Sequence, residues 1–497
     1  MTRVIELRRG SYRDSVTLMQ VTRAVSDVPG VTAALVAMAT ELNLELLDGM
    51  GFAPPPDLTP NDMVVAIDAA GDGELATARD ALDAALAARA TAPAGGFGDA
   101  PPPRTIGSAA RRSDATLAVI STPGATAFLD TMDALEAGLS VMLFSDNVPV
   151  EHEVWLKDEA ARRGLLVMGP DCGTAVVSGV GLGFANVVRP GPVGLVAASG
   201  TGAQQLLCLL DGSGVGVSHC LGVGGRDLSA AVGGRSTRAA LDLLAADEAT
   251  EVILVVSKPP EAEVADEVRR QADTLGKPVL FALLGPGQPD LTAAAQRAVQ
   301  AAGGTWTEPR VWPATDPIDG TGGTALRGLF AGGTLCYEAM VIASEALGPI
   351  RSNIPLQLDW ALPADLSATG HTMIDYGDDR LTQGRPHPMI DGSLRAERMR
   401  DEAADPTCGV LLLDVVLGHA AHPDPADELA PAISAAHATA RADGRELTVV
   451  VALVGAAGDP QGVDRQAEAL QQAGASVHLS NADAARTAVA LVEKHAG

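Results

Sequence analysis

Residues 191–207 read GPVGLVAASGTGAQQLL, and this stretch decides the fold. An apolar run ends at Ala198, and the small residues at 199–202 lead directly into a helical pattern. A strand that passes into a helix through a glycine-rich turn is the repeating step of α/β proteins. Such a turn leaves N–H groups at the positive end of the helix dipole, where phosphate binds. We therefore predict a phosphate site at Ser199, Gly200, Thr201 and Gly202; an ordinary serine-capped turn is the alternative.

The segment 411–423, LLLDVVLGHAAHP, has the same layout of strand, glycine and helical pattern. It predicts a second phosphate contact at Gly418, His419 and Ala420, where a neutral His419 would donate to an oxyanion. A metal at His419 and His422 would need an acidic or cysteine ligand at suitable spacing, and none is present, so we predict no metal. A helix start that carries surface histidines is the remaining alternative.

Three short turns supply candidate substrate contacts. Two glycine-rich loops carry Arg226 and Arg235, which could bring local positive charge to an anionic ligand or could equally be solvated. The turn MGPDCG contains Asp171 and Cys172. A reactive Cys172 would need a nearby cation.

Continuous apolar strands alternate with helical segments from residue 104 onward. This alternation predicts α/β architecture with parallel sheets covered on both faces. Residues 303–326 read as loop and 328–346 as helix. The predicted strands are 115–120, 141–144, 165–168, 194–197, 215–220, 251–256, 278–283, 409–413, 447–453 and 476–479.

The first 90 residues follow a different plan. Strands at 4–7, 31–38 and 62–67 and helices at 15–26 and 74–88 resemble a ferredoxin-like α+β unit. Residues 91–103, TAPAGGFGDAPPP, are rich in Gly and Pro, have no apolar period and read as a linker.

Composition excludes several classes of protein. A net charge of −27 repels nucleic acid and anionic membranes, so we expect neither as a partner. Five scattered cysteines without a CxxC pair indicate a reducing compartment. The chain starts without an apolar leader and has no apolar run long enough to span a membrane. We therefore expect a cytoplasmic protein.

The residues above resemble the succinyl-CoA synthetase superfamily. MGPDCG is similar to a turn in the CoA-binding domain of its α subunit, and residues 115–189 resemble the second half of that domain. GPVGLVAASGTG and CLGVGGRDL resemble the α ligase domain, and VLLLDVVLGHAAHPD resembles the C-terminal domain of the β subunit. In that enzyme the two corresponding helix starts face one phosphate.

Two departures from the synthetase affect its chemistry. The synthetase carries phosphate on a histidine downstream of its KPV strand, whereas this chain has no histidine between His219 and His371. Residues 350–389 are too few for an ATP-grasp domain. Acyl-CoA synthesis through a phosphohistidine is therefore not expected.

Over its whole length the chain is similar to FdrA proteins, through YRDSVTLMQ, MATELN, ISTPG, RGLFAGGTL, GRPHPMIDGSLR and LLLDVVLGHAAHPDPA. The resemblance implies a ferredoxin-like unit at 1–90, a Rossmann-like CoA-binding-type domain at 104–190, and flavodoxin-like ligase domains at 191–348 and 349–497. It also implies one subunit of a heteromeric oxamate carbamoyltransferase in ureide catabolism, which converts oxalurate and phosphate into oxamate and carbamoyl phosphate.

That resemblance implies small anionic substrates, further carbamoyltransferase subunits as partners in an oligomer, and no cofactor, with CoA binding weak or absent. Thr201 and His419 are the expected catalytic residues, and Arg226 or Arg235 would hold the acceptor carboxylate. Two alternatives stay open. The chain could be an acyl-CoA synthetase that retains CoA binding, or a non-catalytic scaffold or regulatory subunit with residues 1–90 as its sensor.

Overall fold

The computed structural model describes residues 2–13, 15–53, 55, 58–90, 103–314, 322–367, 369–382 and 385–496. The linker predicted at 91–103 lies outside them, apart from residue 103. The chain divides into two compact units, one formed by residues 1–104 and 379–391 and the other by residues 105–378 and 392–497.

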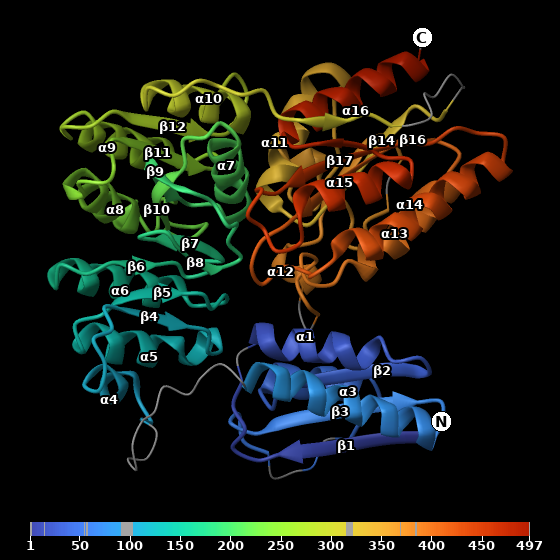
Figure 1. Cartoon of the computed structure of the whole chain (residues 1–497), viewed down its shortest axis with the longest axis horizontal. Helices are drawn as coiled ribbons and strands as arrows, with labels where there is room; N and C mark the ends of the chain where they lie inside the picture. The colour runs from blue at the N-terminus through green and yellow to red at the C-terminus, as the bar shows by residue number, and fades with distance from the viewer. Residues whose placement is uncertain are drawn as a thin grey trace. The chain divides into compact units, whose positions relative to one another are not determined.

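The first unit contains a three-stranded antiparallel sheet of order β1-β3-β2, in which β3 pairs with both neighbours (Figure 1). Helix α1 connects β1 to β2, so the N-terminal part is a βαβ unit with β3 between its strands. Apolar residues of α1 and α3, such as Val21 and Leu82, pack on one face of the sheet. The elements are β1 Thr2–Arg8, α1 Ser15–Ser26, β2 Val31–Met38, α2 Glu41–Gly49, β3 Met63–Ala69 and α3 Asp72–Ala90.

A segment distant in sequence completes this first unit. Residues 379–391 include α12 (Asp379–Thr382), and Asp391 pairs with Arg23 of α1 at 2.5 Å. Both side chains are only about one-fifth exposed. The pair therefore joins α1 to residues 379–391 within the first unit.

The second unit is α/β throughout and is built on three sheets (Figure 1). Their strand orders are β4-β5-β6, β12-β11-β9-β10-β7-β8 and β13-β18-β17-β16-β14-β15. The first sheet is parallel, and the other two carry antiparallel strands at an edge. The strands are β4 Leu117–Ile120, β5 Ser140–Leu143, β6 Val167–Met168, β7 Thr174–Val177, β8 Val180–Gly183, β9 Pro190–Ala197, β10 Val217–Gly222, β11 Val252–Ser257, β12 Val279–Leu283, β13 Val311–Trp312, β14 Ala325–Phe330, β15 Thr372–Asp375, β16 Cys408–Val416, β17 Thr448–Val454 and β18 Ser476–His478.

The helices of this unit follow strands in the order that the apolar pattern indicates. They are α4 Ile106–Ala110, α5 Gly124–Glu136, α6 Val150–Arg162, α7 Gly200–Gly212, α8 Arg235–Ala246, α9 Ala262–Ala272, α10 Leu291–Ala301, α11 Gly333–Leu347, the short 3-10 helix η1 Leu358–Trp360, α13 Ser393–Ala404, α14 Pro425–Ala442, α15 Val463–Gln472 and α16 Asn481–Ala496.

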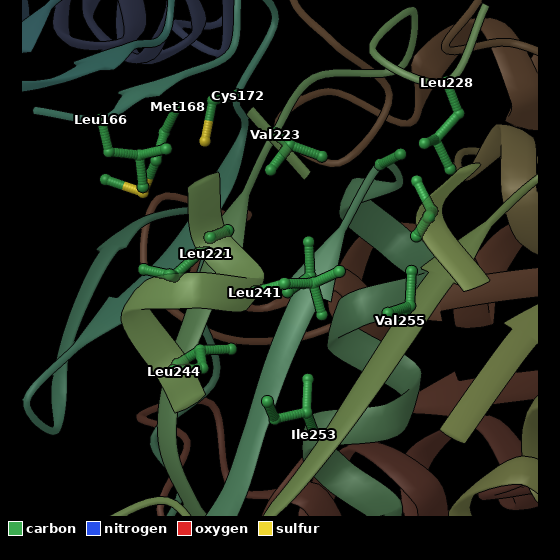
Figure 2. Packing of buried hydrophobic residues seen from close by; sticks show 14 of the residues in the cluster. Leu166, Met168, Cys172, Leu221, Val223, Leu228, Leu241, Leu244, Ile253 and Val255 are labelled. Atoms are coloured by element: carbon green, nitrogen blue, oxygen red, sulfur yellow. The ribbon is translucent and has the colours of Figure 1, made fainter. Parts of the chain in front are cut away.

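One apolar core joins the β4–β6 region to the sheet that contains β9. Figure 2 shows Leu241 and Leu244 of α8 packed with Ile253 and Val255 of β11. Met168 at the end of β6 belongs to the same cluster. This shared core fixes the β9–β11 strand ends relative to the segment that precedes them.

Two parts of the second unit differ from the sequence prediction. Residues 325–330 form β14, a strand between β15 and β16, although we expected loop up to 326 and helix from 328. Strands β7 and β8 were not among the predicted strands, and they join the sheet of β9 and β10. The apolar stretch at 325–330 is short and contains Arg327, which obscured its strand character; Arg327 is buried in ion pairs with Glu402 and Asp405.

Candidate functional site

The first helix start of the site lies where β9 passes into α7. Ser199 is the N-cap in extended conformation, and its Oγ accepts a hydrogen bond from the N–H of Gly202 at 3.0 Å. Gly200 is exposed and Thr201 is half-buried. Among the residues that the structure describes, no protein group accepts the N–H of Gly200 or Thr201. Both N–H groups lie at the N-terminus of a 13-residue helix, which is the positive end of the helix dipole.

A second helix start, at the N-terminus of α11, has the same construction. Gly332 is its N-cap after β14. The carboxylate of Asp414 accepts the N–H of Ala331 at 2.6 Å and the N–H of Gly332 at 2.8 Å. Within the described residues, the next N–H groups, those of Gly333 and Thr334, have no protein acceptor. Asp414 thus holds the turn and leaves the first helical donors available.

These two helix starts are in contact. The hydroxyl oxygens of Ser199 and Thr334 lie 2.6 Å apart. A Cβ at Gly332 would lie 2.7 Å from Oγ1 of Thr201, closer than a real Cβ approaches a neighbour, so only glycine permits this packing. The positive ends of α7 and α11 therefore meet at one place, which we call the α7–α11 junction (residues 199–202 and 332–334).

Two charged residues border the junction. Lys258 follows β11 and is exposed, and Asp375 ends β15 and is 5% exposed. A Cβ at Gly333 would lie 3.2 Å from Nζ of Lys258 and would overlap Oδ2 of Asp375. Burial raises the pKa of Asp375 to about 7, although Lys258 and the N–H of Gly377 favour its charged form. The junction thus combines helix dipoles, a cation and a carboxyl group that titrates near neutrality.

Arg395 of α13 compensates the charge of Asp414. Its Nη1 donates to Oδ1 of Asp414 at 2.9 Å and to the Asp414 carbonyl at 2.7 Å. Both side chains are nearly inaccessible, at 5% and 0% exposure. Burial raises the pKa of Asp414, whereas Arg395 and the two turn N–H groups oppose that shift. The Arg395–Asp414 pair therefore holds the N-terminus of α11 in place, and the pair itself is closed to solvent.

The helix predicted to begin at Gly418 was wrong, because α14 begins at Pro425. The N–H of Gly418 donates to Oε1 of Gln461 at 3.1 Å, and the N–H of His419 donates to the Ala185 carbonyl at 2.8 Å. Gly418 has φ +113, and a Cβ there would lie 2.6 Å from the Ala185 oxygen. Two of the three predicted positions, Gly418 and His419, thus have their N–H groups occupied within the protein, and the helix start that meets α7 belongs to α11.

The two histidines of this loop have different surroundings. His419 is exposed, and its Cδ2 would lie 3.8 Å from a Cβ at Gly181. Nδ1 of His422 accepts the N–H of Asp424 at 3.0 Å, directly before α14. No group of three His, Cys, Asp or Glu side chains among the described residues is arranged to hold a metal ion.

The two candidate arginines contact the α6 region. Arg226 pairs with Glu153 at 2.9 Å and donates to the Val148 carbonyl at 2.8 Å. Arg235 pairs with Asp158 at 2.8 Å. The structure therefore gives each guanidinium group a carboxylate partner on α6, which satisfies its charge without an acceptor substrate.

The turn at Asp171 and Cys172 is a structural element. The N–H of Asp171 donates to the Ser145 carbonyl at 2.9 Å. Cys172 is 2% exposed and belongs to the core cluster shown in Figure 2. Burial raises the pKa of its thiol far above the usual value. The expected substrate contact by Cys172 is therefore corrected, because the side chain is enclosed by apolar residues.

Sequence reasoning missed Gly333, Thr334, Lys258 and Asp375. A signal was present in GLFAGGTLCYEA, residues 328–339, which repeats the order of strand, small residues and helix found at 194–205. Reading 328–346 as continuous helix concealed it. Lys258 stands directly after the apolar strand VILVVS, at the carboxyl end where α/β sheets bind ligands.

Comparisons with known proteins identify relatives of both ends of the chain. The family model described as CoA-ligase matches residues 329–491, and the model described as AllF, heavy metal-associated domain, matches residues 1–102. YahF, an uncharacterized protein of Escherichia coli (strain K12), is 37% identical over 491 residues, which cover 95% of each chain. The ADP-forming succinate–CoA ligase subunit alpha 2 of Archaeoglobus fulgidus is 29% identical over 182 residues, covering 35% of this chain and 61% of that protein.

The chain is also similar to solved structures of acetyl-coenzyme A synthetases. The apo form of the dinucleotide forming acetyl-coenzyme A synthetase 1 of Ca. Korarchaeum cryptofilum aligns with a TM-score of 0.30 at 16% identity. That alignment covers 79% of this chain and 86% of the synthetase.

The description of the N-terminal family mentions a heavy metal, but the residues present do not fit one. Residues 1–102 contain neither cysteine nor histidine. These are the side chains that soft and borderline metals prefer.

No helix within the described residues has the length and apolar character needed to cross a membrane.

Proposed function

Because this chain belongs to the family of CoA-ligase-type proteins that includes Escherichia coli YahF, we propose that it is a subunit of a carbamoyltransferase of the oxamate type. Oxalurate and phosphate would be converted into oxamate and carbamoyl phosphate, as the resemblance to FdrA proteins implies. The match of residues 1–102 to the AllF model supports this choice within the family.

One observation carries the proposal, namely the contact between the N-termini of α7 and α11 beside Lys258. N–H groups at 200–201 and 333–334 have no protein acceptor in the described part of the chain. Two helix dipoles and an ammonium group favour a multiply charged anion at this point. Phosphate and the phosphoryl group of carbamoyl phosphate have the charge and size that such donors recognise.

The proposed catalysis rests on positioning rather than on a covalent intermediate. Backbone N–H groups and the Thr201 hydroxyl would stabilise the charge that develops on phosphate and on the carbamoyl oxygen. Lys258 would hold the phosphate. The backbone N–H of His419 would not contact the phosphate, since it donates to the Ala185 carbonyl.

The CoA-ligase match at residues 329–491 favours one rival, an acyl-CoA synthetase. That chemistry in the synthetase family uses a phosphohistidine, and the chain has no histidine between His219 and His371. The helix that follows β12, α10 at Leu291–Ala301, begins with LTAAAQ and offers no nucleophilic nitrogen. The carbamoyltransferase is therefore the better supported proposal.

The experiment is oxalurate phosphorolysis by the full chain, alone and reconstituted with the proteins encoded beside it. We expect phosphate-dependent formation of carbamoyl phosphate and oxamate in equal amounts, without CoA or ATP. Thr201→Ala should lower the rate about 10²–10³-fold, the usual effect of losing one oxyanion donor. Thr274→Ala, on an exposed turn, is the matched control and should not change the rate. Acyl-CoA formation that requires CoA and nucleotide, or tight CoA binding, would contradict the proposal.

A further inference from the structure

The proposed phosphate binding at the α7–α11 junction gives no role to Asp375. Its backbone is fixed by Asn353, which accepts the Asp375 N–H and donates to the Asp375 carbonyl, both at 2.9 Å. Its Oδ1 accepts the N–H of Gly377 at 2.9 Å. In the part of the chain that the structure describes, Oδ2 has no hydrogen-bond partner and lies against Gly333. One carboxyl oxygen is thus anchored, and the other faces the first turn of α11.

The surroundings of Asp375 come from several elements. Lys258 after β11 is the cation that faces it, whereas Asp378 after β15 and Asp414 on β16 are negative. Cys336 on α11 is buried close to the same carboxylates and stays protonated because burial raises its pKa. Burial also raises the pKa of Asp375 to about 7. Near neutral pH the carboxyl group can therefore both accept and donate a proton.

We infer that Asp375 carries the proton that carbamoyl transfer has to move between phosphate and the amide nitrogen of oxamate. This inference rests on the proposed function. It places an acid–base group directly beside the N–H donors of Gly333 and Thr334 that would hold the phosphate.

The chemistry balances with no additional reactant. In phosphorolysis an oxygen of hydrogenphosphate bonds to the carbamoyl carbon of oxalurate, and the bond from that carbon to the oxamate nitrogen breaks. The phosphate loses its proton and the departing amide nitrogen gains one, so the proton count is unchanged. An amide anion is a poor leaving group, which is why a proton donor at this place accelerates the step. Asp375 takes the proton from phosphate and returns it to the nitrogen.

The rival role is that of a negative charge that attracts Lys258 and only positions its ammonium group. Both roles predict a loss of activity in Asp375→Asn, so the pH profile has to separate them. The reverse reaction, from oxamate and carbamoyl phosphate, is the suitable assay. Free phosphate is then a product and not the substrate whose concentration is varied. In this direction the carboxylate accepts the amide proton, and the wild-type rate should fall as the pH drops below about 7.

The test compares pH–rate profiles of the full protein with its partner subunits. Asp375→Asn should lower kcat about 10²–10⁴-fold, the range for a general acid–base group, and should lose the acidic limb. Asp375→Glu should restore part of the rate together with that limb. Asp378→Asn is the matched charge variant: Asp378 helps raise the pKa of Asp375, so its removal should keep the acidic limb and move it to lower pH. Thermal unfolding of each variant checks that it is folded.

Three outcomes are informative. A folded Asp375→Asn variant with the wild-type rate and profile would overturn the inference while the proposed function stands. A reduced rate with the acidic limb intact would assign Asp375 to positioning Lys258, and would also overturn it. A wild-type complex without any phosphorolysis would overturn the proposed function itself, and with it the role of Asp375.

Discussion

The hydroxyl oxygens of Ser199 and Thr334 lie 2.6 Å apart, although 135 positions separate the two residues in the chain. Ser199 caps α7, and Thr334 lies in the first turn of α11. Their contact brings together the N-termini of two helices that belong to different sheets. The proposed phosphate site depends on this relationship.

Gly332→Ala should disrupt the junction. The added Cβ would lie within 3.0 Å of three atoms of Thr201, so the two helix starts must separate. Overpacking of this kind costs about 1–3 kcal/mol. We expect a lower unfolding midpoint together with weaker phosphate binding. Gly276→Ala is the control, because a Cβ there meets nothing within 4 Å. Equal effects of the two changes would contradict the prediction.

Asp414→Asn should be among the most destabilising single changes in the second unit. It removes the charge that Arg395 faces in a site without solvent, and it puts an amide where a carboxylate accepts two N–H groups. Removing one partner of a buried ion pair costs about 3–5 kcal/mol. Denaturant unfolding measures this loss. Asp443→Asn is the control, because the Asp443 carboxylate that pairs with Arg445 is itself exposed.

A second change distinguishes charge from shape at this pair. Arg395→Met in the Asp414→Asn background removes the cation whose charge Asp414 no longer balances and should recover part of the lost stability. A double variant that is less stable than Asp414→Asn would show that the guanidinium contributes mainly through other contacts.

Much of the fold could be predicted from sequence because its signal is local. Apolar runs such as 251–256 and 447–453 coincide with β11 and β17 within a residue or two. The strand-to-helix turn at 199–202 was also correctly predicted, since Ser199 caps α7. The elements that were missed depend on distant partners. Arg327 is tolerated in β14 because Glu402 and Asp405 neutralise it.

Of the two helix starts in the candidate site, the sequence indicated only the one at α7. The residues at 418–420 have the composition of an anion-binding turn, but Gln461 and Ala185 take the N–H groups of Gly418 and His419. Neither acceptor is near in sequence, so the local pattern contains no sign of them. Lys258 and Asp375 are brought to the same glycine by β11 and β15 of different sheets, which no local pattern reveals.

Glu338→Gln should change how stability depends on pH. Glu338 is buried on α11, and burial raises its pKa from 4.5 to about 7 despite hydrogen bonds from Asn481 and the N–H of Leu291. The folded state then holds the proton more tightly than the unfolded state. The contribution of Glu338 to the stability of the folded state is therefore fully present below pH 4.5 and is lost as the pH rises through about 7.

Calorimetric unfolding temperatures across this pH window test the prediction. Relative to Glu338→Gln, the wild type should lose stability as the pH rises, because the variant has no proton to release. Glu345→Gln, at an exposed position of the same helix, should follow the wild type. Parallel curves for wild type and Glu338→Gln would show that Glu338 does not titrate in this range.

All five cysteines should be unreactive in the folded protein. Each is buried and free of disulfides, and burial raises the pKa of Cys220 and Cys408 to about 12. The thiolate is the reactive form, so alkylation at neutral pH should be negligible until denaturant is added. Mass spectrometry after treatment with a maleimide measures this. Rapid labelling of Cys172 in the folded protein would contradict this prediction, and Cys172 would remain a candidate site residue.

Calorimetric titration of the full-chain Lys258→Gln variant with phosphate tests whether the α7–α11 junction holds phosphate. If the α7–α11 junction holds phosphate, losing the ammonium donor should weaken binding about tenfold or more, since a hydrogen bond to a charged group contributes about 1.5–3 kcal/mol. His419→Gln should bind phosphate like the wild type, and Arg238→Gln, in an exposed pair with Glu267, controls for net charge. Wild-type affinity in Lys258→Gln together with a large loss in His419→Gln would place the phosphate at the Gly418 loop and contradict the account.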